Sequence, residues 1–286
     1  MVSHRPISRG KHRARLGQGW LATAYVTAAL TTVALVATVS TSEGAAVPRW
    51  VAGPARAAPS PAPPPEVHVD HTGFLSWALL DRATGTINGS ANIAAPSDTM
   101  SMIKAWIAAD YLRMAADAEI SEARLRQLTV MIRDSDNAAT QALFRAVGRR
   151  ASIERLIATC GLTESSAYGD WWSNTTVSAR DTVRLGACIA DGRAAGPRWT
   201  AWLLDEMRQV RGAGDFGVRL ALPDPGAVAI KNGWLLRDED KLWHISCLAI
   251  ASEWVLAVLI RYPGELGFDY GTALCEEVGR QVVAPV

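Results

Sequence analysis

The chain has little excess charge of either sign and very few lysines. Among its 286 residues, 29 Lys and Arg balance 28 Asp and Glu, and only four of the basic residues are lysines. Five basic residues precede the first acid, Glu43, so the rest of the chain has a net charge of −4. Surfaces that bind nucleic acids are strongly basic, so this balance argues against a nucleic-acid partner.

Clusters of metal-ligating side chains are also scarce. The segment His68-Val69-Asp70-His71 suggests a metal site, but no further group of His or Cys completes a ligand set. We interpret the segment as a lead-in strand with two solvated histidines. We therefore expect no metal and no other cofactor.

Charge and proline are both absent from Trp20 to Ser40. A helix of this length rises about 30 Å, enough to span the hydrocarbon core of a bilayer. The basic residues before it predict a cytoplasmic N-terminus and an extracytoplasmic body. The alternative is a cleaved secretory signal, with Gly44-Ala45-Ala46 as the cleavage site. No cysteine lies near that point, which argues against a lipid-modified N-terminus.

A spacer rich in proline and alanine follows, with seven prolines between residues 41 and 70. Such a composition favours extended polyproline structure and cannot build a core. We therefore divide the chain into a basic tail (1–19), a transmembrane or signal-anchor helix (20–40), a linker (41–71) and a folded domain (72–286).

Four cysteines, all in the folded domain, allow three disulfide pairings: Cys160, Cys188, Cys247 and Cys275. An even number outside the cytoplasm favours two disulfides, and the order along the chain favours 160–188 and 247–275. Buried free thiols are the alternative.

Hydrophobic periodicity and turn residues predict strands, then helices, then strands in the folded domain. The expected strands are 73–80, 86–93, 227–236, 242–251 and 254–262. The expected helices are 101–117, 122–133, 137–147, 152–160, 178–192, 199–210 and 267–283. This order predicts an α+β fold, in which an antiparallel sheet of about five strands comes from both chain ends. The last helix packs on the sheet, and an all-helical region is inserted between its halves.

The segment around Ser101 is the first candidate site. Residues three apart on a helix share a face, so the Ser101 hydroxyl and the Lys104 amine are expected within hydrogen-bond reach. A desolvated lysine can take the proton of a serine and make it a nucleophile. A helix start near Ser101 would also favour negative charge on a nearby oxygen.

Two further motifs follow in the chain. Ser135-Asp136-Asn137 falls in a break between two expected helices, and Lys231-Asn232-Gly233-Trp234 falls on an expected strand. Two of the four lysines thus lie within these motifs. Each motif alone also suits a plainer role, since serines often cap helices and strand lysines are often solvated.

Together, Ser101-x-x-Lys104, Ser135-Asp136-Asn137 and Lys231-Asn232-Gly233 resemble the signature of the penicillin-recognising serine hydrolases, in particular the class A β-lactamase-like group. The resemblance covers residues 72–286 and implies the β-lactamase/transpeptidase-like form of the α+β fold. It implies a β-lactam or a cell-wall peptide as the partner.

The resemblance also implies a role for each residue. Ser101 would be the acylated nucleophile, Lys104 its base, and Ser135 a proton relay to the leaving nitrogen. The substrate would be bound by Asn137, by Lys231 and at the open strand beside Gly233. The backbone N–H groups of Ser101 and Trp234 would form the oxyanion hole, while Asp136 would hold its loop.

The chain departs from this signature in three places. The Glu-x-x-Leu-Asn motif, whose glutamate activates the deacylating water, is missing, and neither Glu164 nor Asp170 begins it. Asn232 replaces the usual threonine, and only 34 residues separate Ser101 from Ser135. Trp171 and Trp172 suit either a cleft wall or the aromatic core.

We therefore expect an extracytoplasmic serine hydrolase of β-lactamase type, membrane-anchored or secreted. A D-alanyl-D-alanine carboxypeptidase or penicillin-binding protein is the second reading, because acylation without a placed water base can stall before hydrolysis. A catalytically quiet envelope protein that binds wall fragments is the third.

Overall fold

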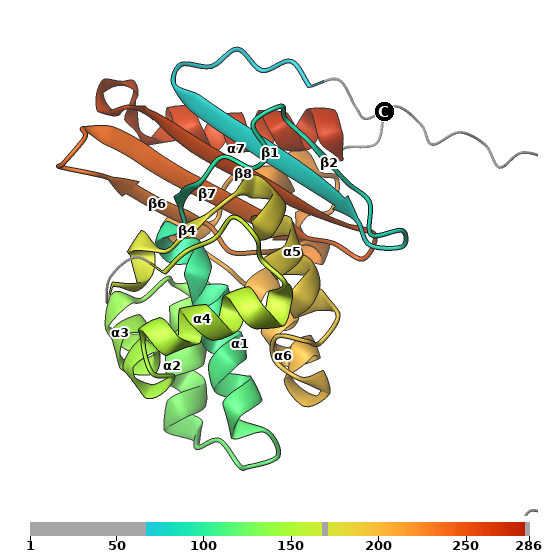
Figure 1. Ribbon diagram of the computed structural model, residues 1–286, viewed down its shortest axis with the longest axis vertical. Helices are drawn as coiled ribbons and strands as arrows, with labels where there is room; N and C mark the ends of the chain where they lie inside the picture. The colour runs from blue at the N-terminus through green and yellow to red at the C-terminus, as the bar shows by residue number, and fades with distance from the viewer. Residues whose placement is uncertain (1–66, 168–170, 284–286) are drawn as a thin grey trace, which may run out of the picture. The chain divides into compact units, whose positions relative to one another are not determined.

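The computed structural model describes residues 67–167 and 171–283 (Figure 1). The expected basic tail and N-terminal membrane helix, and most of the linker, lie outside these residues. Within them, no helix is both long and apolar enough to cross a membrane.

The elements follow the expected order of strands, helices and strands. The strands are β1 (Phe74–Asp81), β2 (Ile87–Gly89), β3 (Ser97–Asp98), β4 (Thr176–Val177), β5 (Ala229–Ile230), β6 (Gly233–Leu236), β7 (Leu242–Ile250) and β8 (Trp254–Pro263). The α-helices are α1 (Lys104–Ala115), α2 (Glu122–Arg133), α3 (Asn137–Ala146), α4 (Arg150–Cys160), α5 (Ala179–Ala190), α6 (Pro197–Arg208) and α7 (Gly267–Val282).

The main sheet joins the two ends of the folded domain. Its order is β2-β1-β8-β7-β5, and β6 pairs with the same strand β7, next to β5 along its length. All pairs are antiparallel. Val258 of the central strand β8 lies opposite Trp77 of β1 on one side and opposite Cys247 of β7 on the other. In Figure 1 the cyan β1 accordingly lies beside β8, far away in the sequence. The α+β fold with an antiparallel sheet from both chain ends is therefore confirmed.

Strand β7 is buried on both faces from His244 to Ile250, because helices cover both sides of the sheet. Successive strand side chains point to opposite faces, and β7 shows both kinds of partner. Cys247 bonds to Cys275 of α7, whereas Leu248 lies against Gly186 of α5, where an added Cβ would come within 3.0 Å of its side chain. The expected packing of the last helix on the sheet is confirmed.

The inserted helical region is built around α1. Five successive residues of this helix, from Ala105 to Ala109, are fully buried. A helix that is apolar on every side needs neighbours all round, and α1 contacts α2, α3, α4, α5 and α6. The residues that lead into α1 are thereby held against a rigid core.

Several local expectations are corrected. The expected strand at 227–236 is two short strands, Ala229–Ile230 and Gly233–Leu236. Both keep one register on β7, and between them Lys231 N still donates to Leu248 O at 3.1 Å. The second strand is three residues long rather than eight. The lead-in strand at His68 is absent, and residues 67–72 reach β1 without regular structure.

Both expected disulfides are present. Cys160–Cys188 joins α4 to α5, and Cys247–Cys275 joins β7 to α7. Each closes a loop with a sequence separation of 28 residues. The free-thiol alternative is therefore wrong.

Candidate functional site

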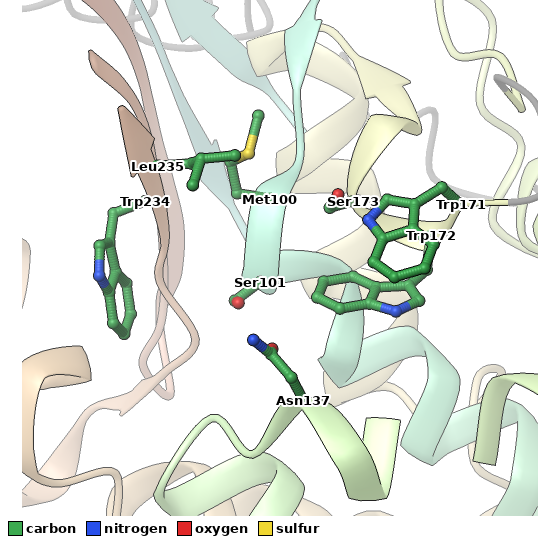
Figure 2. A pocket seen from close by; sticks show the side chains of 8 residues that line it. All are labelled: Met100, Ser101, Asn137, Trp171, Trp172, Ser173, Trp234 and Leu235. Carbon is green, nitrogen blue, oxygen red and sulfur yellow. The ribbon is translucent and has the colours of Figure 1, made fainter. Parts of the chain in front are cut away.

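A cleft of about 210 Å³ lies where the sheet meets the helical region (Figure 2). Its walls come from four parts of the chain: the segment before α1, the start of α3, the turn before β4, and β6. The lining residues are Met100, Ser101, Asn137, Trp171, Trp172, Ser173, Trp234 and Leu235. Three of the predicted site residues, Ser101, Asn137 and Trp234, are thus brought together at its surface.

Ser101 lies in a short 3₁₀ turn, η1 (Met100–Ile103), that leads from β3 into α1. Its neighbour Met100 has a φ of +47°, which is uncommon for a residue with a side chain. Such backbone strain persists only where the surroundings hold it, and it clusters at functional sites. Here the amide of Thr99 is fixed by the carbonyl of Thr175 at 2.9 Å. The turn presents Ser101, which is partly exposed, to the cleft.

Lys104 is the first residue of α1 and is completely buried. Its Nζ donates to Ser135 O at 2.6 Å, to Ser135 Oγ at 3.2 Å and to Asn137 Oδ1 at 2.7 Å. All three ammonium protons thus have acceptors. No hydrogen bond to Ser101 Oγ is formed among the described residues, so Lys104 bonds to Ser135 and Asn137 and not, as expected, to Ser101.

Burial also changes the acidity of Lys104. Desolvation lowers the pKa of the ammonium to about 7, and the nearby charge of Asp136 only partly opposes this. An amine with such a pKa is neutral in about half of the molecules at pH 7. Lys104 can therefore act as a base at neutral pH.

Ser135 lies in the break between α2 and α3, with a φ of +57°. Its Oγ receives hydrogen bonds from two lysines, Lys104 at 3.2 Å and Lys231 at 3.1 Å. The loop is held by Asp136, whose Oδ1 accepts the amide proton of Ala139 at 2.6 Å and caps α3. Asp136 thus has the loop-holding contact that the sequence predicted.

Lys231 lies between β5 and β6 and is completely buried. Desolvation lowers its pKa well below the usual value, and the charge of Lys104 lowers it further. Its Nζ is bonded to Ser135 Oγ and does not line the cleft surface.

Gly233 allows β6 to approach the serine closely. A Cβ at this position would lie 2.5 Å from the backbone nitrogen of Ser101 and 2.5 Å from Thr99 O. Next to it, Trp234 packs edge-on against Phe216 with ring centroids 5.7 Å apart. Figure 2 shows Trp234 on one side of Ser101, with Trp171 and Trp172 on the other.

Asn232 does not face the cleft. Its side-chain amide donates to Gly214 O at 3.1 Å and to Phe216 O at 2.8 Å, and the residue is buried. The asparagine that replaces threonine in the motif therefore secures the segment behind Trp234. Sequence reasoning missed this contact, because its acceptors are 16 and 18 residues away in a stretch without periodicity.

The contact of Trp172 with Lys104 is the second feature that sequence reasoning did not identify. Its ring centroid lies 4.8 Å from Lys104 Nζ, and the side chain is 4% exposed. Both expected roles are found: Trp171 and Trp172 line the cleft with stacked rings 6.0 Å apart, and Trp172 also belongs to the buried hydrophobic core. The contact with Lys104 could not be predicted from the Trp-Trp pair alone.

Glu164, an acid of the loop before β4, is engaged away from the cleft. Glu164 pairs with Arg180 at 3.0 Å and accepts the hydroxyl proton of Ser178 at 3.0 Å. It does not line the cleft, whereas Asp170 lies outside the described residues. Within residues 67–167 and 171–283, no group of His, Cys, Asp and Glu is arranged to hold a metal.

A comparison of the sequence with protein families finds one match. The model of the beta-lactamase enzyme family matches residues 123–284, more than half of the chain. No curated protein matches the chain.

Solved structures match the fold at low sequence identity. A beta-lactamase from Chitinophaga pinensis has a TM-score of 0.59 at 16% identity, covering 73% of this chain and 92% of its own. A beta lactamase from Xanthomonas campestris has a TM-score of 0.59 at 16% identity, with 73% and 91% covered. The structure of PBP-A has a TM-score of 0.57 at 18% identity, with 73% and 88% covered.

Proposed function

Because this chain belongs to the beta-lactamase enzyme family, we propose that it is an active-site serine hydrolase that cleaves a β-lactam or a related amide through an ester on Ser101. The observation that carries the proposal is the convergence of Lys104 and Lys231 on Ser135. Lys104 is also bonded to Asn137, which lines the cleft together with Ser101. A nucleophile, a neutral amine, a second hydroxyl and a cation are the groups that acyl transfer from such an amide requires.

In this mechanism the Ser101 oxygen attacks the carbonyl carbon of the amide, and its proton passes to Lys104. The developing oxyanion accepts hydrogen bonds from the backbone N–H groups of Ser101 and Trp234. Ser135, held between the two lysines, relays a proton to the leaving nitrogen. Asn137 binds the amide side chain of the substrate. When Lys104 is neutral, Lys231 holds the remaining proton of the pair and supports the substrate carboxylate electrostatically. Among the described residues Lys104 has no hydrogen bond to Ser101, and catalytic hydrogen bonds often tighten only when substrate binds.

A D-alanyl-D-alanine carboxypeptidase or penicillin-binding protein is the second candidate. It is favoured by the missing Glu-x-x-Leu-Asn motif and by the absence of a carboxylate in contact with Lys104 among the described residues. Among the structural neighbours, L2 is described as complexed with relebactam, and another is PBP-A. A quiet wall-binding relative would keep the fold without the chemistry.

For the location of the protein we propose the extracytoplasmic side of the membrane, with residues 20–40 as an anchor or a cleaved signal. The two disulfides support this location, because such bonds persist in oxidising compartments. Protease accessibility of the folded domain on intact cells tests it. A domain that stays protected until the cells are lysed contradicts the proposal.

The test of the reaction is to mix the purified protein with a penicillin and follow intact mass and drug loss together. Rapid drug loss without a lasting adduct supports a β-lactamase, and a lasting adduct on Ser101 supports the peptidase or penicillin-binding protein. No adduct and no drug loss support the quiet relative. An adduct that persists in Ser101→Ala refutes the assigned nucleophile.

A further inference from the structure

Ser135 lies on a short stretch between α2 and α3 that has little support of its own. Its φ of +57° is a conformation that residues with side chains seldom adopt, and it persists only where neighbouring contacts hold it. Among the described residues, Ser135 forms no hydrogen bond with another backbone group. The position of its hydroxyl therefore depends on the residues at either side, Asp134 and Asp136.

Asp136 is held by the helix that it caps, whereas Asp134 is held by Arg211. The Arg211 guanidinium donates two hydrogen bonds to the Asp134 carboxylate, from Nε at 2.6 Å and from Nη2 at 2.8 Å. The Arg211 amide also donates to Arg133 O at 3.0 Å. The hydrogen bonds from the guanidinium lower the pKa of Asp134, so the pair stays charged at neutral pH. Arg211 thus contacts both of the residues that precede Ser135.

Arg211 belongs to a segment, residues 210–216, that is also fixed beside β6. The side-chain amide of Asn232 donates to Gly214 O at 3.1 Å and to Phe216 O at 2.8 Å. Asn232 is buried, so these bonds are shielded from water and hold the segment in place. One segment is thus bonded both to the loop before α3 and to the residue that precedes β6.

These contacts close a ring around Ser135. On one side, Lys231 donates to Ser135 Oγ at 3.1 Å, and its neighbour Asn232 holds the segment. On the other side, Arg211 of the segment holds Asp134. The side chains of this pair are 60% and 38% exposed, and exposed ion pairs contribute little to stability. Loss of the pair should therefore change the position of Ser135 more than the folding of the domain.

We infer that Arg211 is a positioning residue for proton transfer by Ser135. The inference rests on the proposed function, since it concerns the same acylation. In that step the Ser101 oxygen bonds to the carbonyl carbon, the carbon–nitrogen bond breaks, and the proton of Ser101 passes to Lys104. Ser135 gives its own proton to the leaving nitrogen and regains one from Lys104, so the protons balance. A Ser135 hydroxyl that is displaced from Lys104 transfers this proton more slowly.

Two kinds of substrate distinguish this role from general damage to the site. The leaving nitrogen of a penicillin must gain a proton as its bond to the carbonyl carbon breaks. A p-nitrophenyl ester instead releases a stable phenolate anion, which needs no proton from Ser135. With the full chain in excess, loss of penicillin and release of p-nitrophenolate measure acylation of Ser101 whether or not the adduct lasts. Ser101→Ala gives the background, and thermal melting checks folding.

Arg211→Gln, Asp134→Ala and the double variant all remove the same pair. Each should lower the saturating rate constant for penicillin by about 10- to 100-fold, because a small misplacement of a reacting group has effects of this size. The half-saturating concentration should not change, and the losses should not add in the double variant. The rate constant with the ester should stay at the wild-type value. Arg211→Lys, which keeps a charged donor, should recover part of the rate with penicillin.

Arg193→Gln is the matched control. Arg193 pairs with Asp191 at 2.7 Å, their side chains are 50% and 43% exposed, and neither residue lines the cleft. This variant should lose as little thermal stability as Arg211→Gln and should keep the wild-type rates with both substrates.

Equal losses with both substrates overturn the inference, because the damage then extends to Ser101 itself. An unchanged rate with penicillin in Arg211→Gln, or additive losses in the double variant, also overturn it, and the proposed function stands in each of these cases. A wild-type protein that consumes neither substrate through Ser101 overturns both. If only penicillin reacts, the comparison of single and double variants decides. If Arg211→Gln does not fold, Asp134→Ala and Arg211→Lys provide the same comparison.

Discussion

Lys104 and Lys231 donate hydrogen bonds to the same oxygen, Ser135 Oγ, from 3.2 and 3.1 Å. Both lysines are completely buried, and burial lowers the pKa of both. Two like charges so close to one hydroxyl oppose each other, so the pair favours loss of one proton. The site therefore provides a neutral amine near pH 7 without a histidine.

The acylation rate should follow the neutral fraction of Lys104. With a pKa of about 7, this fraction rises about tenfold between pH 6 and pH 8, so the acylation rate constant should rise by a similar factor. The measurement is the rate of adduct formation with a penicillin under single-turnover conditions.

Lys104→Ala should abolish acylation without unfolding the domain. Lys241→Gln changes an exposed lysine and should keep both the rate and its pH profile. A pH-independent rate in the wild-type protein, or full acylation in Lys104→Ala, would remove Lys104 from the role of base.

The free energy of unfolding should increase from pH 7 to pH 9. Between the folded pKa of Lys104, about 7, and its higher unfolded value, the unfolded chain binds more protons than the folded one. Stability then rises with pH, by up to about 1.4 kcal/mol per pH unit for one proton. The pKa of Tyr262 is raised to about 12. Its ionisation therefore lowers the free energy of unfolding as the pH rises, but only near pH 10 and above. Urea titrations at several pH values measure the slope.

Lys104→Met provides the comparison for this slope. The variant lacks the titrating amine, so its stability should depend less steeply on pH over the same range. The interpretation fails if the two proteins have the same slope, because the desolvated ammonium of Lys104 would then not be its source.

Gly233→Ala should damage both stability and acylation. The new Cβ would lie 2.5 Å from Ser101 N and 2.5 Å from Thr99 O, so β6 must move away from the serine. Overpacking of this kind costs about 1–3 kcal/mol. Thermal melting and adduct formation are measured together, with Gly226→Ala as the control, since its nearest contact is at 3.5 Å. Unchanged acylation in Gly233→Ala would show that the closeness of β6 does not matter for the site.

Asn232→Thr restores the usual threonine of the motif but should destabilise this protein. The substitution leaves the carbonyls of Gly214 and Phe216 without their donor, at a cost of about 1–3 kcal/mol. We expect no gain in acylation, because the side chain points away from the cleft. The control is Asn88→Thr on the edge strand β2. It should leave the free energy of unfolding, measured by chemical denaturation, almost unchanged. A stable Asn232→Thr variant that acylates faster would contradict the structural role.

Much of the fold could be predicted from the sequence, because it is encoded locally. The helix from Glu122 to Arg133 follows from its apolar period, and the start of α5 follows from Ser178, whose Oγ accepts the amide proton of Asp181. The order of the cysteines favoured the two disulfides that the structure contains. Three short motifs likewise indicated Ser101, Ser135 and Lys231 before their positions were known.

Other features were decided only by tertiary packing. The partners of Lys104 lie 31 and 33 residues away, and the bond from Lys231 to Ser135 spans 96 residues. The contact of Trp172 with Lys104 and the inward direction of Asn232 depend on which surfaces meet. Hydrophobic period and turn chemistry describe neighbours along the chain, whereas these contacts arise where the sheet closes against the helical region. The sequence by itself thus determined which groups were present, and the packing decided which of them touch.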